Sequence, residues 1–306
     1  MATGLIAVLM GGRSAEREIS LQTGEGVSRA LETLGYATCT FDDDERLVDG
    51  LRQARPAAVF NALHGGAGED GRIQALLDWL GLGYQGSGVR ACAIAMDKWV
   101  TKAVAVAQRL PVPRGILVRA QDAGHVVPAQ LGFPCVVKPN DEGSAIGVSI
   151  VRDPNDLSAA LATAHTDRVL VEEFIDGREL TVAVLGDEAL PLVEITPHDS
   201  FYTYHAKYTP GGSTHTVPAQ IDAGIAKTIQ EDALALHRAL GARDYSRIDV
   251  MLDKTGGHYF LECNTLPGLT ALSLFPDAAR AAGMTYEALV GRLVECARSR
   301  TSPAWR

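Results

Sequence analysis

Short apolar runs alternate with amphipathic stretches along the first 96 residues. The apolar runs predict buried strands at 5–10, 37–41 and 59–63. The intervening stretches predict helices at 16–34, 45–54 and 73–80. Strands and helices that alternate in this order form a parallel sheet with helices on its faces. The pattern therefore predicts a doubly wound α/β domain at the N-terminus.

Glycine-bearing loops follow the first and third of these strands, at 11–16 and 64–71. Ligands of open parallel sheets bind beyond the carboxyl ends of the strands, so both loops are candidate walls of a site. The second loop contains Gly66-Ala-Gly68-Glu-Asp-Gly71, which formally matches a dinucleotide fingerprint. It follows a later strand, however, and no acidic residue closes a suitable ribose strand downstream. A nicotinamide oxidoreductase is therefore only an alternative hypothesis.

Two lysines occupy distinctive places after residue 96. Lys98 opens a predicted helix that runs to about Ala107, and Lys138 ends an otherwise apolar strand. The turn that follows contains Gly143 and Ser144, where backbone N–H groups can approach a phosphate chain. A single lysine is more often a solvated surface residue. The strand-end position of Lys138 nevertheless favours an anion-binding interpretation.

A hairpin is predicted near the C-terminus, where two apolar strands flank the turn 253–258. A symmetric hairpin centred between Thr255 and Gly256 pairs residues whose numbers sum to 511. Asp249 then lies opposite Glu262, and Arg247 lies opposite Asn264. All four share one face, because strand side chains alternate. The opposite face would carry the apolar side chains Ile248, Val250, Leu261 and Cys263.

The facing pair Asp249 and Glu262 suggests a metal site. Like charges directly opposite each other destabilise a sheet, so the two carboxylates require a cation between them. Oxygen ligands of this kind suit Mg²⁺, which binds through one or two carboxylates together with substrate phosphates. The alternative is a half-solvated strand whose polar face simply meets water.

Acidic residues also mark a strand–turn–strand segment at 169–184. They are either strand-end charges that face water or part of an adenosine site. In the second interpretation Glu172 accepts a hydrogen bond from a ribose hydroxyl or from the adenine amino group. Backbone groups between Glu173 and Ile175 would then contact the adenine edge. Spacing alone leaves both interpretations open.

The length and the net charge of the chain limit the number of subdomains and the kinds of partner that we expect. A chain of 306 residues exceeds the size at which one core keeps growing, so we expect two or three subdomains. The net charge of −9 argues against a general nucleic-acid or membrane surface. The five cysteines are scattered, which is typical of a reduced cytosolic protein. The apolar run at 5–10 is too short for a signal or membrane segment.

Several motifs occur together in one order along nearly the whole chain. They are the glycine loop with Glu16, Ala62-Leu-His64-Gly, Met96-Asp-Lys98, Val137-Lys138-Pro139 with Gly143-Ser144, Glu172, Glu179-Leu-Thr-Val, Ala206-Lys207-Tyr208, Arg247-Ile-Asp249-Val and Glu262-Cys-Asn264-Thr-Leu-Pro-Gly268-Leu-Thr. This set resembles the D-alanine–D-alanine ligases of the ATP-grasp superfamily. The resemblance implies a cytoplasmic enzyme that joins two D-alanines for peptidoglycan, with ATP as the energy source and an acyl phosphate as the intermediate.

The resemblance also implies a domain plan and an assembly. The plan combines α/β and α+β units: an N-terminal doubly wound parallel-sheet domain at 1–96, then a two-subdomain ATP-grasp fold at 97–181 and 182–306. A lid loop at 198–218, with Gly211 and Gly212 as a hinge, would close over the nucleotide and exclude water. Family members of this kind are expected to form homodimers.

The site residues that the resemblance implies fall into four groups. Nucleotide binding is assigned to Lys98, Lys138, Glu172, Glu173, Phe174, Ile175, Glu179 and Lys207. Two Mg²⁺ ions, or Mn²⁺ in their place, are assigned to Asp249, Glu262 and Asn264. Catalysis is assigned to Glu16, Ser144, Tyr208, Arg247 and Gly268. Binding of the two D-alanines is assigned to Glu16, His64, Ser273 and Leu274.

Three positions depart from the pattern expected of close relatives. Ala145 stands where a second serine is frequent, Glu173 where a lysine can cap the adenine, and Leu266 where a small polar residue is usual. Two further hypotheses remain open alongside the oxidoreductase. They are another ATP-grasp ligase that joins a carboxylate to an amine, and a nucleotide sensor without catalytic activity.

Overall fold

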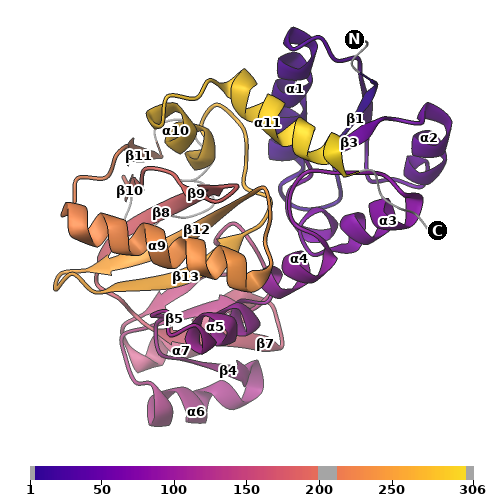
Figure 1. The fold of residues 1–306 in the computed structure, drawn as a ribbon. Coiled ribbons are helices and arrows are strands. Elements are labelled where there is room, and N and C mark those ends of the chain that lie inside the picture. The colour runs from indigo at the N-terminus through magenta and orange to yellow at the C-terminus, as the bar shows by residue number, and fades with distance from the viewer. Residues whose placement is uncertain (1–3, 199–211, 301–306) are drawn as a thin grey trace.

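A computed structural model of the protein describes residues 4–198 and 212–300, which form three sheets covered by helices (Figure 1). The N-terminal sheet is parallel and has the order β2-β1-β3, with bounds Ile6–Leu9 for β1, Thr38–Phe41 for β2 and Ala58–Asn61 for β3. The predicted doubly wound N-terminal domain is confirmed. No helix in the described ranges combines the length and apolar character needed to cross a bilayer.

Both faces of the N-terminal sheet are buried, because side chains alternate along β1. Ile6 and Val8 pack into one core, whereas Ala7 and Leu9 pack into another. The first core is covered by α1 (Arg17–Thr33) and α11 (Tyr286–Ser299). The second is covered by α2 (Leu47–Ala54) and α3 (Arg72–Leu80). The C-terminal helix therefore returns to the N-terminal sheet, as Figure 1 shows.

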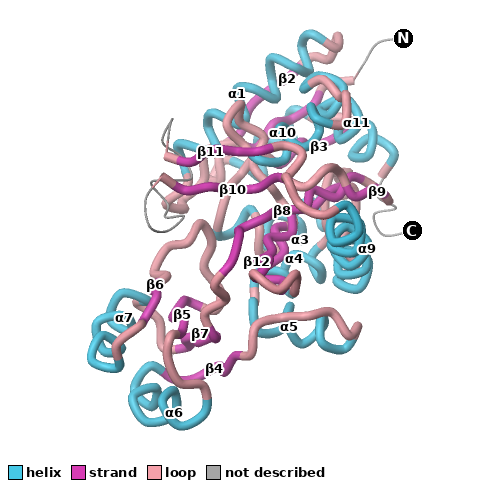
Figure 2. Tube along the Cα trace, turned by 90° about the vertical axis from the view of Figure 1, so that its left-hand side faces the viewer, coloured by secondary structure: helices cyan, strands magenta, loops and turns pink. Residues whose placement is uncertain are grey.

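The second sheet is antiparallel with the order β4-β7-β5-β6, comprising β4 (Gly115–Arg119), β5 (Cys135–Pro139), β6 (Ser149–Val151) and β7 (Arg168–Glu173). Its core holds Cys135 and Val137 together with residues of α6 (Ala123–Gln130) and α7 (Leu157–Ala164). Figure 2 shows both helices beside this sheet. Alternation therefore turns Val136 and Lys138 to the other face, where a large cavity lies.

The third sheet is also antiparallel, with the order β11-β10-β8-β12-β13 and β9 paired to β8. Its strands are β8 (Gly177–Leu185), β9 (Glu188–Ala189), β10 (Val193–Pro197), β11 (Ser213–Thr216), β12 (Tyr245–Asp253) and β13 (His258–Asn264). The core on one face includes residues of α5 (Lys98–Ala107) and α9 (Ala223–Leu240), and the other face packs against α10 (Leu274–Ala281). The remaining elements are α4 (Val89–Met96) and the short 3₁₀ turns Gly66–Gly68, Ala120–Asp122 and Pro154–Asp156.

The hairpin of β12 and β13 has the two predicted pairs, but its strands are not paired in one symmetric register up to the turn. Asp249 lies opposite Glu262 and Arg247 opposite Asn264. Nearer the turn, however, Val250 pairs with Phe260 rather than with Leu261, because a bulge shifts the register. Phe260 therefore joins the core in place of Leu261, which lines the large cavity. The expectation of a symmetric hairpin with Leu261 in the core is wrong.

Two of the expected segment bounds, at residue 181 and at 198–218, fall within strands of the third sheet or include one. A boundary at 181 falls inside β8, all of which pairs with β12. Within the expected lid at 198–218, residues Ser213–Thr216 form β11 and pair with β10. Lys207, Tyr208 and Gly211 lie outside the described residues. The division of the chain at residues 96 and 181 stays a proposal. Helix α11, although it is last along the described chain, packs on the N-terminal sheet.

Candidate active site

Two cavities meet at the junction of the three sheets. The smaller encloses about 100 Å³ between the N-terminal domain and the third sheet. The larger encloses about 520 Å³ between the second and third sheets, a size typical of small-molecule sites. Lys98, Glu142 and Glu262 line both cavities. A group bound in one cavity can therefore reach a group bound in the other at this point.

The predicted site residues divide between these cavities. The smaller cavity is lined by Glu16, His64, Ser144, Arg247, Asn264, Gly268, Ser273 and Leu274. The larger is lined by Lys138, Glu172, Glu173, Phe174, Ile175, Glu179 and Asp249. Side chains assigned to substrate thus gather in one space and those assigned to nucleotide in the other, although their positions intermix along the chain.

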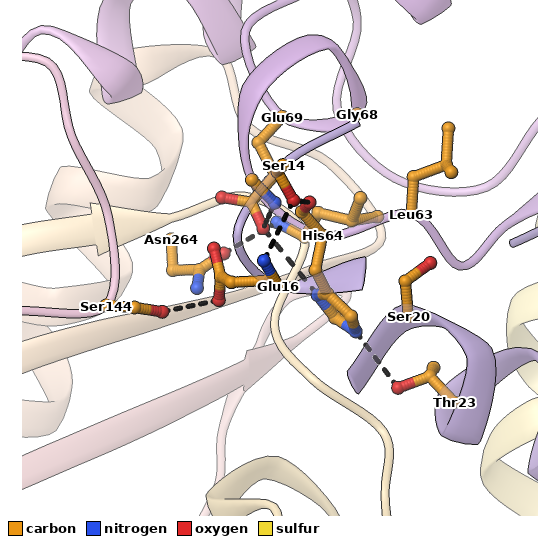
Figure 3. A network of polar contacts seen from close by, with 12 residues as sticks. Ser14, Glu16, Ser20, Thr23, Leu63, His64, Gly68, Glu69, Ser144 and Asn264 are labelled. Atoms are coloured by element: carbon orange, nitrogen blue, oxygen red, sulfur yellow. Dashed lines mark hydrogen bonds and ion pairs between the residues drawn. The ribbon is translucent and has the colours of Figure 1, made fainter. Parts of the chain in front are cut away.

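Glu16 and Ser144 both line the smaller cavity, and their side chains point toward each other (Figure 3). Glu16 directly precedes α1, and its backbone N–H donates to the Ser14 hydroxyl at 3.1 Å. The Ser144 hydroxyl donates to the Glu16 carboxylate across the cavity. Ser144 has a φ of 53°, in the left-handed region, so the turn after Lys138 holds this side chain in a specific direction.

His64 is buried beside Glu16, and each of its ring nitrogens faces a polar side chain. Its Nε2 lies 3.0 Å from the Thr23 hydroxyl, and its Nδ1 lies 3.6 Å from the Glu69 carboxylate (Figure 3). Glu69 in turn accepts a hydrogen bond from the Gly65 N–H at 3.0 Å. Sequence reasoning missed Thr23 and Glu69. The signal for Glu69 was its place in the glycine loop 64–71, which was expected to form a wall of the site without a role for Glu69 itself.

Gly268 allows two loops to approach each other closely. A Cβ atom at this position would lie 2.9 Å from the Ser273 hydroxyl oxygen and 3.8 Å from the His64 ring. The Ser273 hydroxyl oxygen accepts from the Thr270 N–H at 3.0 Å, which orients it. Leu274 begins α10, whose N-terminal N–H groups carry partial positive charge. This end of the cavity suits a carboxylate.

Asp249 is held by three donors on the face of the hairpin. Both of its oxygens accept from Arg247, at 2.9 Å from Nε and 2.9 Å from Nη2. The Thr181 hydroxyl donates to the same carboxylate at 2.6 Å. Across the hairpin, the Lys98 ammonium lies 3.5 Å from Glu262. The repulsion expected between the facing carboxylates is therefore balanced by two cationic side chains, and Thr181 was not anticipated.

The donor set at the hairpin fits Mg²⁺ in its chemistry. Asp249, Glu262 and Asn264 offer carboxylate and amide oxygens, which hard divalent cations prefer. Within residues 4–198 and 212–300, no three His, Cys, Asp or Glu side chains converge as a metal-binding group. Two carboxylates and one amide would thus leave several coordination positions for phosphate oxygens and water. The side chains fit an ion that arrives with a nucleotide.

Glu172 lies between two lysines at the base of the larger cavity. Its carboxylate is 2.5 Å from the Lys138 ammonium and 2.6 Å from the Lys102 ammonium. Burial alone raises the pKa of this carboxyl, but Lys138 and Lys102 outweigh it and hold the pKa below its ordinary value. The side chain expected to contact ribose or adenine is thus engaged by two cations. Lys102 was not predicted, because an isolated helical lysine carries no signal.

The stretch assigned to adenine carries Glu173 at the position where a lysine was expected in close relatives, and this side chain is paired within the protein. The Glu173 carboxylate accepts from the Arg114 N–H at 2.8 Å and from its guanidinium at 2.9 Å. The backbone N–H groups of Glu173 and Phe174 donate to Arg114 and Pro134 carbonyls. An adenine edge would therefore meet the Ile175 N–H or the carbonyls of this stretch. Arg152 stacks over the Phe174 ring at 4.8 Å.

Known proteins resemble this chain over nearly its whole length. The family model described as "D-ala D-ala ligase C-terminus" matches residues 101–295. A D-alanine–D-alanine ligase of Nitrosospira multiformis is 46% identical over 293 residues, which cover 95% of this chain and 96% of that protein.

Two solved structures share the fold. The D-alanine–D-alanine ligase of Bacillus anthracis, complexed with ATP, matches with a TM-score of 0.85 and 32% identity over 98% of this chain and 99% of that one. The VanG D-Ala:D-Ser ligase of Enterococcus faecalis matches with a TM-score of 0.82 and 27% identity, over 96% and 99%. On these grounds, the chain belongs to the family of D-alanine–D-alanine ligases.

Proposed function

We propose that this protein joins two D-alanine molecules into D-alanyl-D-alanine for peptidoglycan synthesis, with conversion of ATP to ADP and phosphate. The observation that carries this proposal is the junction of the two cavities at Lys98 and Glu262. A nucleotide in the larger cavity can present its terminal phosphate there to a carboxylate in the smaller one. The glycine loop of the alternative oxidoreductase hypothesis instead holds Glu69 near His64.

The first step requires that one D-alanine be held with its carboxylate at the junction. The Glu16 carboxylate, oriented by Ser144, is placed to receive the ammonium group of this molecule. The D-alanine carboxylate attacks the terminal phosphorus of ATP, and ADP leaves. The product is an acyl phosphate, whose carbonyl carbon is far more reactive toward an amine than the carbon of a carboxylate. Lys98 and Lys138 neutralise charge on the phosphoryl group as it transfers.

The second step forms the peptide bond. The amine of the second D-alanine, as the free base, attacks the carbonyl carbon of the acyl phosphate, and negative charge develops on the carbonyl oxygen. Arg247 and the Gly268 N–H are proposed to donate to this oxyanion. Ser273 and the Leu274 N–H at the start of α10 are placed for the second carboxylate. Phosphate then leaves, and the amine gives up a proton.

Binding of a metal nucleotide is part of the proposal. We assign Asp249, Glu262 and Asn264 to two Mg²⁺ ions, which when bound neutralise the phosphate oxygens. Arg247, which pairs with Asp249, also lines the smaller cavity, where its guanidinium is proposed to meet the oxyanion. Lys207 and Tyr208, outside the described residues, keep their proposed roles at the terminal phosphate and in selecting an amine.

The activity is tested by following ADP release with ATP and Mg²⁺. Release that requires D-alanine, and does not occur with L-alanine, supports the proposal. Release only with another amino acid as second substrate favours a related carboxylate–amine ligase, of which the D-Ala:D-Ser ligase is a structural neighbour. Nucleotide binding without turnover favours a sensor.

We propose a cytoplasmic location, because the proposed reaction uses ATP, and a homodimer on the basis of the family resemblance. Sedimentation of the purified protein measures the second of these directly.

A further inference from the structure

A second lysine of α5 lies in the interior without lining either cavity. Lys102 is 5% exposed and stands four residues after Lys98, so both side chains leave the same face of the helix. Helix α5 begins where the Asp97 carboxylate accepts from the Val100 N–H at 3.0 Å. That cap fixes the start of the helix and therefore the direction of both lysines.

Lys102 contacts both the second and the third sheet, between which the larger cavity lies. Its ammonium pairs with Glu172 of β7 at 2.6 Å and donates to the Phe260 carbonyl of β13 at 3.1 Å. Phe260 lies two residues before Glu262, the side chain shared by both cavities. Burying an ammonium group is costly unless its contacts compensate for lost water. The contacts of Lys102 with Glu172 and the Phe260 carbonyl compensate for part of this cost, which places a positive charge next to Glu172.

Glu172 is shared by two lysines, only one of which lines the larger cavity. Lys138 and Glu172 line the larger cavity, whereas Lys102 reaches Glu172 from the side of α5. Two ammonium groups and one carboxylate leave a net charge of about +1 at this point. Without Lys102, the 2.5 Å pair between Lys138 and Glu172 would be neutral and self-contained. An anionic ligand in the cavity would then meet no net positive charge from this group.

We propose that Lys102 is a positioning residue that neutralises Glu172 and thereby leaves the charge of Lys138 to the phosphates of the bound nucleotide. This inference rests on the proposed function and adds to it a residue that touches neither substrate nor nucleotide. Its effect is specific to the phosphate part of the ligand. In this inference the adenosine part contacts the chain near Phe174 and Ile175, which also line the cavity, whereas Glu172 is engaged by the two lysines instead of by adenosine.

The test compares ADP with adenosine, measured by calorimetry on the full chain. Lys102→Met removes the charge, and Lys102→Gln removes it while keeping an N–H donor for the Phe260 carbonyl. We expect either change to weaken ADP binding by about ten-fold or more and adenosine binding by less than about two-fold. Lys227→Met removes an exposed lysine of α9 and should leave both affinities unchanged.

A rescue experiment separates charge balance from packing. The double variant Lys102→Met with Glu172→Gln restores a net charge of about +1, now carried by Lys138 alone. We expect it to regain most of the ADP affinity lost in Lys102→Met. Thermal unfolding of each variant, measured without nucleotide, reports the structural cost separately from the affinity.

Two results would overturn the inference. One is equal weakening of ADP and adenosine in Lys102→Gln, which would indicate a structural role. The other is a double variant that binds ADP more weakly than Lys102→Met. A failure of the proposed function would look different, because the unaltered protein itself would then lack D-alanine-dependent ADP release.

Discussion

Asp249 and Glu262 lie directly opposite each other on β12 and β13. Strand residues closer to the turn pair one position out of step with this pair, because Val250 lies opposite Phe260 and not Leu261. The bulge between Asp249 and Val250 brings Asp249 and Glu262 together by adding one residue to β13. Beyond the bulge, the two carboxylates share the face that meets Lys98 and Arg247. The expected metal ligands are thus placed by a local irregularity as well as by strand alternation.

Glu262 should be indispensable for turnover if it holds the metal nucleotide. We expect Glu262→Gln to abolish activity and leave the fold intact, because an amide lacks the charge that a divalent cation requires. ADP release and circular dichroism measure the two effects. Glu231→Gln, an exposed change on α9, serves as the control. Near-normal rates with Mg²⁺ would remove Glu262 from the metal site.

Gly268 should be intolerant of even one methyl group. The Cβ of Gly268→Ala would lie 2.9 Å from the Ser273 hydroxyl oxygen, so the loop that precedes α10 must shift. We expect KM for D-alanine to rise by about ten-fold or more, with little change in KM for ATP. Gly124→Ala in α6, where a Cβ meets nothing within 4 Å, is the matched control. Unchanged KM values in Gly268→Ala would contradict the proposed contact.

Tyr208 should select an amine over a hydroxyl group as the second nucleophile. This prediction comes from the family resemblance, because Tyr208 lies outside the described residues. We expect Tyr208→Phe to let D-lactate compete as second substrate, which chromatography of the products with mixed D-alanine and D-lactate measures. Tyr259→Phe, on β13, is the control for loss of a tyrosine hydroxyl. An unchanged product ratio in Tyr208→Phe would count against the assignment.

His237 should make the fold sensitive to acid. Burial lowers the pKa of this ring from 6.5 to about 4, and its Nδ1 lies 2.7 Å from the Ser246 hydroxyl. Between these two pKa values the unfolded chain binds a proton that the folded protein excludes. Stability from this group is therefore complete above pH 6.5 and lost as the pH falls toward 4, by about 2 to 3 kcal/mol.

The measurement is the free energy of unfolding in urea across that pH range. The variant His237→Asn keeps a polar partner for Ser246 without a titrating ring. We expect its stability to fall less steeply with acid than that of the unaltered protein. Parallel curves for the two proteins would show that the ring does not carry this sensitivity.

Much of the site could be predicted from local patterns. The alternation of apolar residues located the N-terminal strands, and the period of two along 247–264 placed Arg247, Asp249, Glu262 and Asn264 on one face. The motif order then indicated the family. The symmetric turn was wrong because a bulge leaves no clear trace in the pattern. Glu69, Thr181 and Lys102 were missed because each gains its meaning from a partner on another element.

The sequence by itself determined the order of the elements in the N-terminal domain, the shared face of Arg247, Asp249, Glu262 and Asn264, and the chemical types of the candidate ligands. These properties depend on neighbouring residues, whose periodicity is visible along the chain. Only the tertiary structure decided that Glu172 lies between two lysines, that two cavities meet at Lys98 and Glu262, and that the last helix covers the first sheet. Such contacts join distant segments, and their geometry follows from how whole sheets and helices pack together.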